Sequence, residues 1–168
     1  MIESSGITGI EETARPATTA DGARIAEMAA DAIQEQTDAR GGALASAREF
    51  RSLPAGDDIS AAINSSDHLV LVGEFDGVGV GYAVVRLERL RTGAALAVLT
   101  DLYVHAEARE MGVGEALIGA VTEWAEDNQC IGIDSIALPG NRATKNFFET
   151  FGLKARALLV HRSLVEPQ

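Results

Sequence analysis

The stretch LTDLYVHAEAREMGVGEAL, residues 99–117, decides the fold. An apolar, strand-like segment ends at Val104, and a loop that contains Gly112 and Gly114 then opens a helical pattern. Backbone N–H groups are unpaired at the start of a helix, where the helix dipole also favours anions. Glycines let an anion approach these groups closely. The pattern therefore predicts a phosphate-binding loop over residues 109–114.

Two phosphate-binding motifs compete for this loop. A dinucleotide fingerprint needs G-x-G-x-x-G directly after the strand and an acidic residue about twenty positions later, where Asp134 falls. Gly112, however, lies eight residues beyond Val104, and Leu117 stands at the third glycine position. The chain also has too few strand–helix units for a doubly wound sheet, so we reject this motif. The other motif is a glycine-containing loop at a helix N-terminus, in which Arg109 adds charge and directional hydrogen bonds. A bare glycine pair would equally serve the steric needs of a helix start.

Hydrophobic periodicity predicts the remaining elements. The predicted strands are residues 13–18, 68–75, 78–86, 94–104 and 131–138, with one or two more in residues 153–164. The predicted helices run from Asp21, as the N-cap, to just before Arg40, and over residues 43–53, 58–64, 112–129 and 141–151. Asp76-Gly77 accepts the positive φ of a tight hairpin turn. The order predicts one α/β domain of mixed α+β type over residues 13–168, after a flexible segment of residues 1–12. Its mixed central sheet is expected to have about six to seven strands, with helices on both faces.

Composition excludes several classes of function. The 168 residues, 46% hydrophobic and 23% charged, suit one globular domain. The net charge of −11 argues against nucleic acid and anionic membranes as partners. We see no secretory signal and no apolar stretch near the roughly 20 residues that span a bilayer. The single Cys130 fits a reducing cytoplasm, and the three dispersed histidines predict no metal site.

Two motifs together resemble the GNAT N-acetyltransferase superfamily. The strand ending in Leu102-Tyr103-Val104, followed by Arg109-x-x-Gly112-x-Gly114 and an amphipathic helix, resembles the coenzyme A-binding motif of that family. Residues 138–153, LPGNRATKNFFETFGL, are similar to its Asn-x-x-Ala…Phe-Tyr-Glu-x-x-Gly-Phe helix. The opening from Arg15 to Asp21 is also similar, though more weakly. The resemblance spans nearly the whole chain and is strongest over residues 99–153.

The resemblance implies acetyl-CoA as the acyl donor. The strand with residues 102–104 would splay from residues 133–138, and acyl-pantetheine would lie in the gap against free backbone groups. Pyrophosphate would sit on the amides of residues 109–114, and Asn141 would contact the pantetheine arm or its surroundings. The implied cofactor-binding residues are Leu102, Tyr103, Val104, Arg109, Glu110, Met111, Gly112, Val113, Gly114, Asn141, Asn146 and Phe148.

Two departures from the family bear on catalysis. Many members have a tyrosine at the position of Phe148, and the hydroxyl of that tyrosine protonates the departing thiolate. Some members have a glutamate at the position of Thr100. Asp101 is therefore the candidate base or amine anchor, acting directly or through water. Tyr103 lies on the same face of the strand as Asp101, by period-2 alternation, and is a candidate proton donor. Asp101 would equally fit the role of a surface-facing residue or a structural partner. Tyr103 would equally fit the role of a strand residue that only packs.

The resemblance implies transfer of an acetyl group to a primary amine, of a small molecule or a protein, in a ternary complex. The amine would attack the thioester carbonyl, and the thiolate would leave. The alternative is a non-catalytic acyl-CoA-binding or sensing module, which Phe148 and Thr100 favour. The acceptor pocket would be built from residues 35–68, and a homodimer would form through the final strands or helices.

Overall fold

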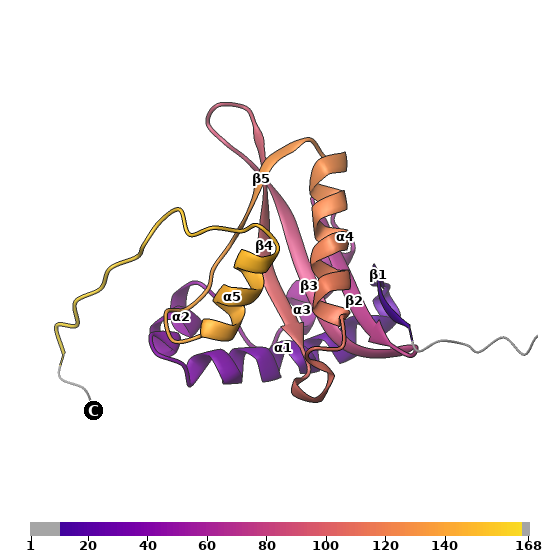
Figure 1. Ribbon diagram of the computed structural model, residues 1–168, viewed down its shortest axis with the longest axis horizontal. Helices are drawn as coiled ribbons and strands as arrows, with labels where there is room; N and C mark the ends of the chain where they lie inside the picture. The colour runs from indigo at the N-terminus through magenta and orange to yellow at the C-terminus, as the bar shows by residue number, and fades with distance from the viewer. Residues whose placement is uncertain (1–10, 166–168) are drawn as a thin grey trace, which may run out of the picture.

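A five-stranded sheet lies between two layers of helices in the part of the chain that the computed structural model describes, residues 11–165 (Figure 1). The strands are β1 (Glu12–Pro16), β2 (His68–Phe75), β3 (Val78–Arg89), β4 (Ala95–Val104) and β5 (Cys130–Ser135). The helices are α1 (Gly22–Thr37), α2 (Gly42–Arg48), α3 (Gly56–Ile63), α4 (Val113–Asp127) and α5 (Arg142–Thr150), with short 3-10 turns η1 (Thr19–Asp21) and η2 (Ala106–Ala108). The predicted mixed α+β class is confirmed.

The sheet is mixed, with strand order β1-β2-β3-β4-β5. The first four strands pair antiparallel, whereas β5 runs parallel to β4 because helix α4 crosses between them. Asp76 and Gly77 have φ values of 51° and 77°, which confirms the predicted tight turn between β2 and β3. No helix among residues 11–165 is long and apolar enough to cross a membrane.

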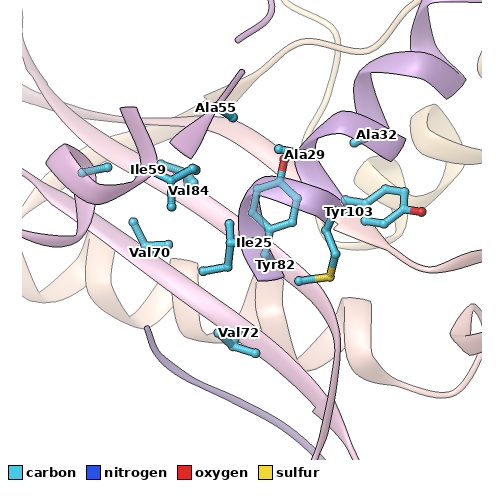
Figure 2. Close-up of a cluster of buried hydrophobic side chains, with 12 residues drawn as sticks. Ile25, Ala29, Ala32, Ala55, Ile59, Val70, Val72, Tyr82, Val84 and Tyr103 are labelled. Carbon is cyan, nitrogen blue, oxygen red and sulfur yellow. The ribbon is translucent and has the colours of Figure 1, made fainter. Parts of the chain in front are cut away.

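Each face of the sheet has its own hydrophobic core. Helices α1 and α3 cover one face, where Ile25, Met28 and Ile59 pack against Tyr82 and Val84 (Figure 2). On the opposite face, apolar side chains of α4 and α5 pack on β2, β3 and β4; they include Leu117, Val121 and Phe148. Because both faces are closed by helices, the polar groups of the site must lie at strand ends and at the edges of these cores.

The predicted strands in residues 153–164 do not form, so the sheet has five strands within the described residues instead of six to seven. The segment after α5 instead runs away from the body of the molecule (yellow in Figure 1). Side chains such as Leu158 and Val160 are each 88% exposed. Strand propensity describes a side chain that fits a pleated, half-buried surface, and a strand also needs a neighbouring edge. Strand β5 is the last strand of the sheet within residues 11–165, and residues 153–164 do not pair with it.

Asp21 is the N-cap residue of α1, as predicted, but its side chain makes no capping hydrogen bond to that helix. Its side chain accepts hydrogen bonds from the Thr18 backbone N–H and from the Arg15 guanidinium, and it closes η1 rather than α1. The predicted first strand begins at Glu12, one residue earlier than expected, and ends at Pro16. Residues 1–10 of the expected flexible segment lie outside the described residues.

Candidate functional site

Pairing between β4 and β5 stops halfway along β4. The last paired residues are Leu99 and Ser135, and the Ser135 hydroxyl donates to the Leu99 carbonyl at 2.9 Å. Strand β5 ends there, whereas β4 continues to Val104. Among the described residues, 100–104 therefore have no partner strand on the side of β5, as the predicted splay requires, although the Val104 carbonyl accepts a hydrogen bond from Arg109 Nε.

A β-bulge at Thr100 decides which way the next side chains point. The register of β3 and β4 shifts there, so that Val85 pairs with Leu99 and Val84 pairs with Asp101. One extra residue moves the following side chains to the other face of the sheet. Leu99 packs under α4, whereas Tyr103 packs under α1. The same shift turns Asp101 toward the α1 side, where the Tyr82 hydroxyl reaches it.

The predicted phosphate-binding loop joins η2 to α4. Glu110 and Gly112 have positive φ values of 67° and 84°, and Gly112 is the N-cap of α4. No hydrogen bond within residues 11–165 uses the backbone N–H groups of residues 110–114. These amides meet at the positive end of the α4 dipole, so this loop can accept an anion.

Close contacts surround both glycines of the loop. A Cβ atom at Gly112 would lie 3.0 Å from the Glu12 side chain. At Gly114, a Cβ atom would lie 3.1 Å from the ring of Phe147. Phe147 also packs on Phe151, with ring centroids 4.8 Å apart. Phe147, which sequence reasoning missed, therefore lies against Gly114 in the first turn of α4.

The Arg109 side chain turns toward α1. Its Nε donates to the Val104 carbonyl at 2.9 Å, and its Nη2 donates to Glu35 at 2.7 Å. The guanidinium carbon lies 5.8 Å from the centroid of the Tyr103 ring. Both partners of the Arg109–Glu35 pair are about half exposed, so the pair contributes little stability and exchanges readily. Arg109 can bind a phosphate only if its guanidinium leaves Glu35.

Asp101 lies in a saturated polar cluster. Arg51, from the segment between α2 and α3, binds both carboxylate oxygens, with Nε at 3.0 Å from Oδ1 and Nη2 at 2.7 Å from Oδ2. The Tyr82 hydroxyl donates to Oδ1 at 3.1 Å, and Thr100 Oγ1 lies 2.6 Å from Oδ2. Only 7% of the Asp101 side chain and 14% of the Arg51 side chain are exposed. A carboxylate offers about four acceptor positions, and all four are used.

Burial and charge shift the pKa values of three groups around this cluster. Burial by itself lowers the pKa of Arg51, but the hydrogen bonds and charge of Asp101 outweigh it and raise the pKa overall. Burial, followed by the charge of Asp101 and the hydrogen bond to it, raises the pKa of the Tyr82 phenol far above its usual value. Burial also raises the pKa of Tyr103, and the charge of Glu35 adds to the effect. All three groups therefore stay protonated at neutral pH.

Asp101 and Tyr103 share a face as predicted, but they do not share hydrogen bonds. The Tyr103 ring packs against Tyr82, with centroids 6.4 Å apart, and Figure 2 shows the two hydroxyl groups pointing in different directions. Tyr82, rather than Tyr103, binds Asp101. The roles of Asp101 and Tyr103 in catalysis stay predictions.

The predicted α5 residues are dispersed. Asn141 is the N-cap of α5, and its side-chain oxygen accepts from the Thr144 backbone N–H at 3.1 Å. Asn146 is exposed. Phe148 is buried in the core between the sheet and α4. The cofactor contacts expected of these residues stay predictions.

Sequence reasoning missed Arg51, Tyr82, Glu35 and Phe147. Arg51 and Glu35 lie at or within the poorly patterned residues 35–68, where neither periodicity nor a motif distinguishes one charged side chain from another. Tyr82 could have been found by pairing the β2–β3 hairpin with β4. That pairing sets Tyr82 opposite Tyr103 and on the same face as Asp101.

His68 begins β2, and its environment lowers its pKa from the ordinary histidine value. Its Nδ1 lies 3.1 Å from the Ser65 hydroxyl. Burial lowers its pKa, and the positive charges of Arg86 and Arg51 lower it further, against a smaller opposite effect of Asp67. The unfolded chain, with an ordinary histidine pKa of about 6.5, therefore binds more protons than the folded protein in slightly acidic solution. The stability that His68 contributes is present above that pKa and is lost as pH falls through the lower, folded value.

We expect a His68→Gln variant to lose less stability than the wild type between about pH 7.5 and pH 5.5. Urea midpoints of both proteins at the two pH values measure the difference. The exposed His161 provides the control, because a His161→Gln variant should follow the wild type. Equal pH dependence of the wild type and His68→Gln would contradict the expectation.

Comparison with known proteins identifies the family and the fold. The acetyltransferase (GNAT) family model matches residues 31–153. The aminoglycoside N-acetyltransferase AAC(6')-Iy, solved in complex with CoA, is similar in structure, with a TM-score of 0.71 and 15% identity over 95% of this chain and 99% of that chain. A variant of the BH1408 protein from Bacillus halodurans has a TM-score of 0.77 and 19% identity, over 90% of this chain and 99% of that chain.

A transcriptional regulator from Bacillus halodurans C-125 is also similar, with a TM-score of 0.67 and 20% identity. This match covers 92% of this chain and 100% of the regulator. No curated protein sequence matches the chain. At these identities, the likenesses to solved structures show the fold alone.

Proposed function

Because this chain belongs to the GNAT acetyltransferase family, we propose that it transfers an acetyl group from acetyl-CoA to the primary amine of a small molecule. One observation carries the proposal. The unpaired edge of β4 over residues 100–104 leads through η2 to the free amides of residues 110–114. The amide groups of pantetheine suit a strand edge, and a pyrophosphate suits a helix start. A single path along the backbone thus matches both parts of the cofactor.

Backbone groups would do most of the cofactor binding. We assign the pantetheine to the strand edge at Leu102, Tyr103 and Val104, where Arg109 would release the Val104 carbonyl. We assign the pyrophosphate to the amides of residues 110–114. Acetyl-CoA, when bound, supplies the acyl group as a thioester with a good leaving group. Holding an amine against that thioester converts a bimolecular reaction into an effectively intramolecular one.

In this proposal, the Asp101 carboxylate accepts a hydrogen bond from the amine, and Thr100 controls access to that carboxylate. The Thr100 hydroxyl has one hydrogen but two acceptors, the Val84 carbonyl at 3.2 Å and Asp101 Oδ2 at 2.6 Å. When the hydrogen turns to Val84, one acceptor position of Oδ2 becomes free for an N–H of the amine. Arg51 then stays bound and holds the carboxylate in place.

Tyr103 would supply the proton that the thiolate takes up. Its raised pKa keeps the phenol protonated, which suits a donor and not a base. The ring is buried at the end of β4, next to the free edge assigned to pantetheine. Phe148 has no hydroxyl and is buried in the opposite core, so it has no part in this step.

The names of two similar proteins support a small-molecule acceptor. AAC(6')-Iy and meta-AAC0020, the latter from an uncultured soil metagenomic sample, are aminoglycoside acetyltransferases, and the latter was solved with sisomicin. A second candidate function, a non-catalytic acyl-CoA-binding module, is favoured by the saturated hydrogen bonding of Asp101. Turnover distinguishes the two functions.

We expect acetyl-CoA to stabilise the protein. A ligand that binds only the folded state adds about 2.7 kcal/mol at 100 times its dissociation constant. Calorimetry with acetyl-CoA and with CoA measures the rise in melting temperature, and adenosine, which lacks both pyrophosphate and pantetheine, is the control. No response at millimolar acetyl-CoA would overturn the proposed cofactor. If acetyl-CoA binds but a broad panel of small amines releases no thiol above the spontaneous rate, the non-catalytic function replaces catalysis.

A further inference from the structure

We propose that the Arg109–Glu35 ion pair is an autoinhibitory clasp, which holds the Arg109 side chain across the cofactor site until coenzyme A displaces it. The inference rests on the proposed position of the cofactor and adds a competitor for that position from within the chain. Glu35, a residue of α1 outside the loop, then helps to set how tightly the protein binds CoA.

Glu35 stands where the apolar stripe of α1 reaches the end of β4. Met28 and Ala32 point from α1 into the core, and the next position of the same stripe, three residues after Ala32, is Glu35. A charged side chain at this position lies at the rim of the core, and 47% of it is exposed. Its carboxylate binds Arg109. After burial, the charge of Glu35 is the next cause that raises the pKa of Tyr103, at the end of β4.

One side chain withholds two parts of the cofactor site. Arg109 Nε donates to the Val104 carbonyl at 2.9 Å, on the strand edge assigned to pantetheine. Arg109 Nη2 donates to a carboxylate oxygen of Glu35 at 2.7 Å, and that guanidinium group would otherwise be available to a phosphate. The guanidinium carbon also lies 5.8 Å from the centroid of the Tyr103 ring. The cofactor cannot use both the Val104 carbonyl and the guanidinium while the clasp is closed.

The carboxylate of Glu35 holds the long Arg109 side chain in the closed position. Arg109 follows η2, and Glu35 lies 74 positions away in sequence, so the pair ties α1 to the loop before α4. Without that carboxylate, the guanidinium is free to turn toward a phosphate on the amides of residues 110–114. The closed clasp and bound CoA exclude each other, so each weakens the other by the same factor.

The exposure of the clasp limits the size of its effect. The side chains of Arg109 and Glu35 are 46% and 47% exposed, and exposed ion pairs change an equilibrium constant by about fivefold at most. A site that is open for about a fifth to a half of the time has its apparent affinity reduced by that fraction. Loss of the clasp should therefore tighten CoA binding about two- to fivefold.

Calorimetric titration of the full chain with CoA, up to millimolar concentration, tests the clasp. A Glu35→Gln variant keeps the size of the side chain and loses its charge. It should bind CoA about two- to fivefold more tightly than the wild type at low salt. This gain should shrink as the salt concentration rises, because salt screens an exposed pair. Asp31→Asn is the matched control, since it removes the same charge from α1 one turn before the residue that Arg109 binds. Its gain should be less than half as large.

Arg109→Ala separates the clasp from a general effect of charge. Arg109→Ala protein should bind CoA more weakly, through the backbone amides, and adding Glu35→Gln should then leave that affinity unchanged. Circular dichroism checks that each variant is folded. An equal gain with and without Arg109 would show that the charge of Glu35 alone repels the cofactor, which overturns the clasp.

The wild type distinguishes failure of the clasp from failure of the proposed function. If the wild type binds CoA and Glu35→Gln binds it no more tightly, the clasp is overturned and the proposed cofactor stands. If neither protein binds CoA, the proposed function and the clasp are overturned together.

Discussion

A Gly114→Glu variant should lose measurable binding of coenzyme A and remain folded. Gly114 lies in the first turn of α4, among the backbone amides assigned to the pyrophosphate. A glutamate there would fill the approach path with a negative charge that repels phosphate. The same charge at a helix N-terminus favours the helix, so the fold should persist. The new Cβ atom would meet the Phe147 ring at 3.1 Å, which requires only a small movement of that side chain.

Gly119→Glu is the matched control, since it adds the same charge to the same helix. A Cβ atom at Gly119 would meet nothing within 4 Å, so this variant should bind CoA like the wild type. Calorimetric titration measures affinity, and circular dichroism measures folding. If folded Gly114→Glu protein binds CoA normally, the pyrophosphate does not lie on this loop, and the proposed cofactor position is wrong.

An Arg51→Ala variant should lower the free energy of unfolding by about 3–5 kcal/mol, because it leaves the Asp101 carboxylate buried without its counter-charge. Total stabilities of about 5–15 kcal/mol make this a large loss. The two side chains are 14% and 7% exposed, so water cannot replace the lost partner fully. Urea unfolding measures the change.

Two further variants separate charge burial from general damage. Arg48→Ala is the control, because Arg48 is mostly exposed and its pair with Glu49 should contribute less than about 1 kcal/mol. An Arg51→Ala, Asp101→Asn double variant should recover part of the loss, since the uncompensated charge is removed. A double variant that is less stable than Arg51→Ala would show that the buried charge is not the cause.

Local features of the sequence were enough to predict the loop, the turn and most elements. A glycine at positive φ, an Asp-Gly turn and a helical stripe of apolar residues depend on neighbours only a few positions away. The loop before α4 and the turn at Asp76-Gly77 were therefore located correctly from sequence. Asp21 was also placed correctly at the N-cap of α1, but its carboxylate binds Arg15 and the Thr18 backbone instead of the amides of that helix.

The environment of Asp101 and the course of the segment after α5 were decided by tertiary structure. Arg51 reaches Asp101 across 50 positions of sequence, and only the bulge at Thr100 turns the carboxylate to the face where that contact is possible. Residues 153–164 have strand composition, but they form no strand pairing within the described residues. Side-chain chemistry along the chain determines what each segment can do, whereas contacts between distant segments determine which of those possibilities is realised.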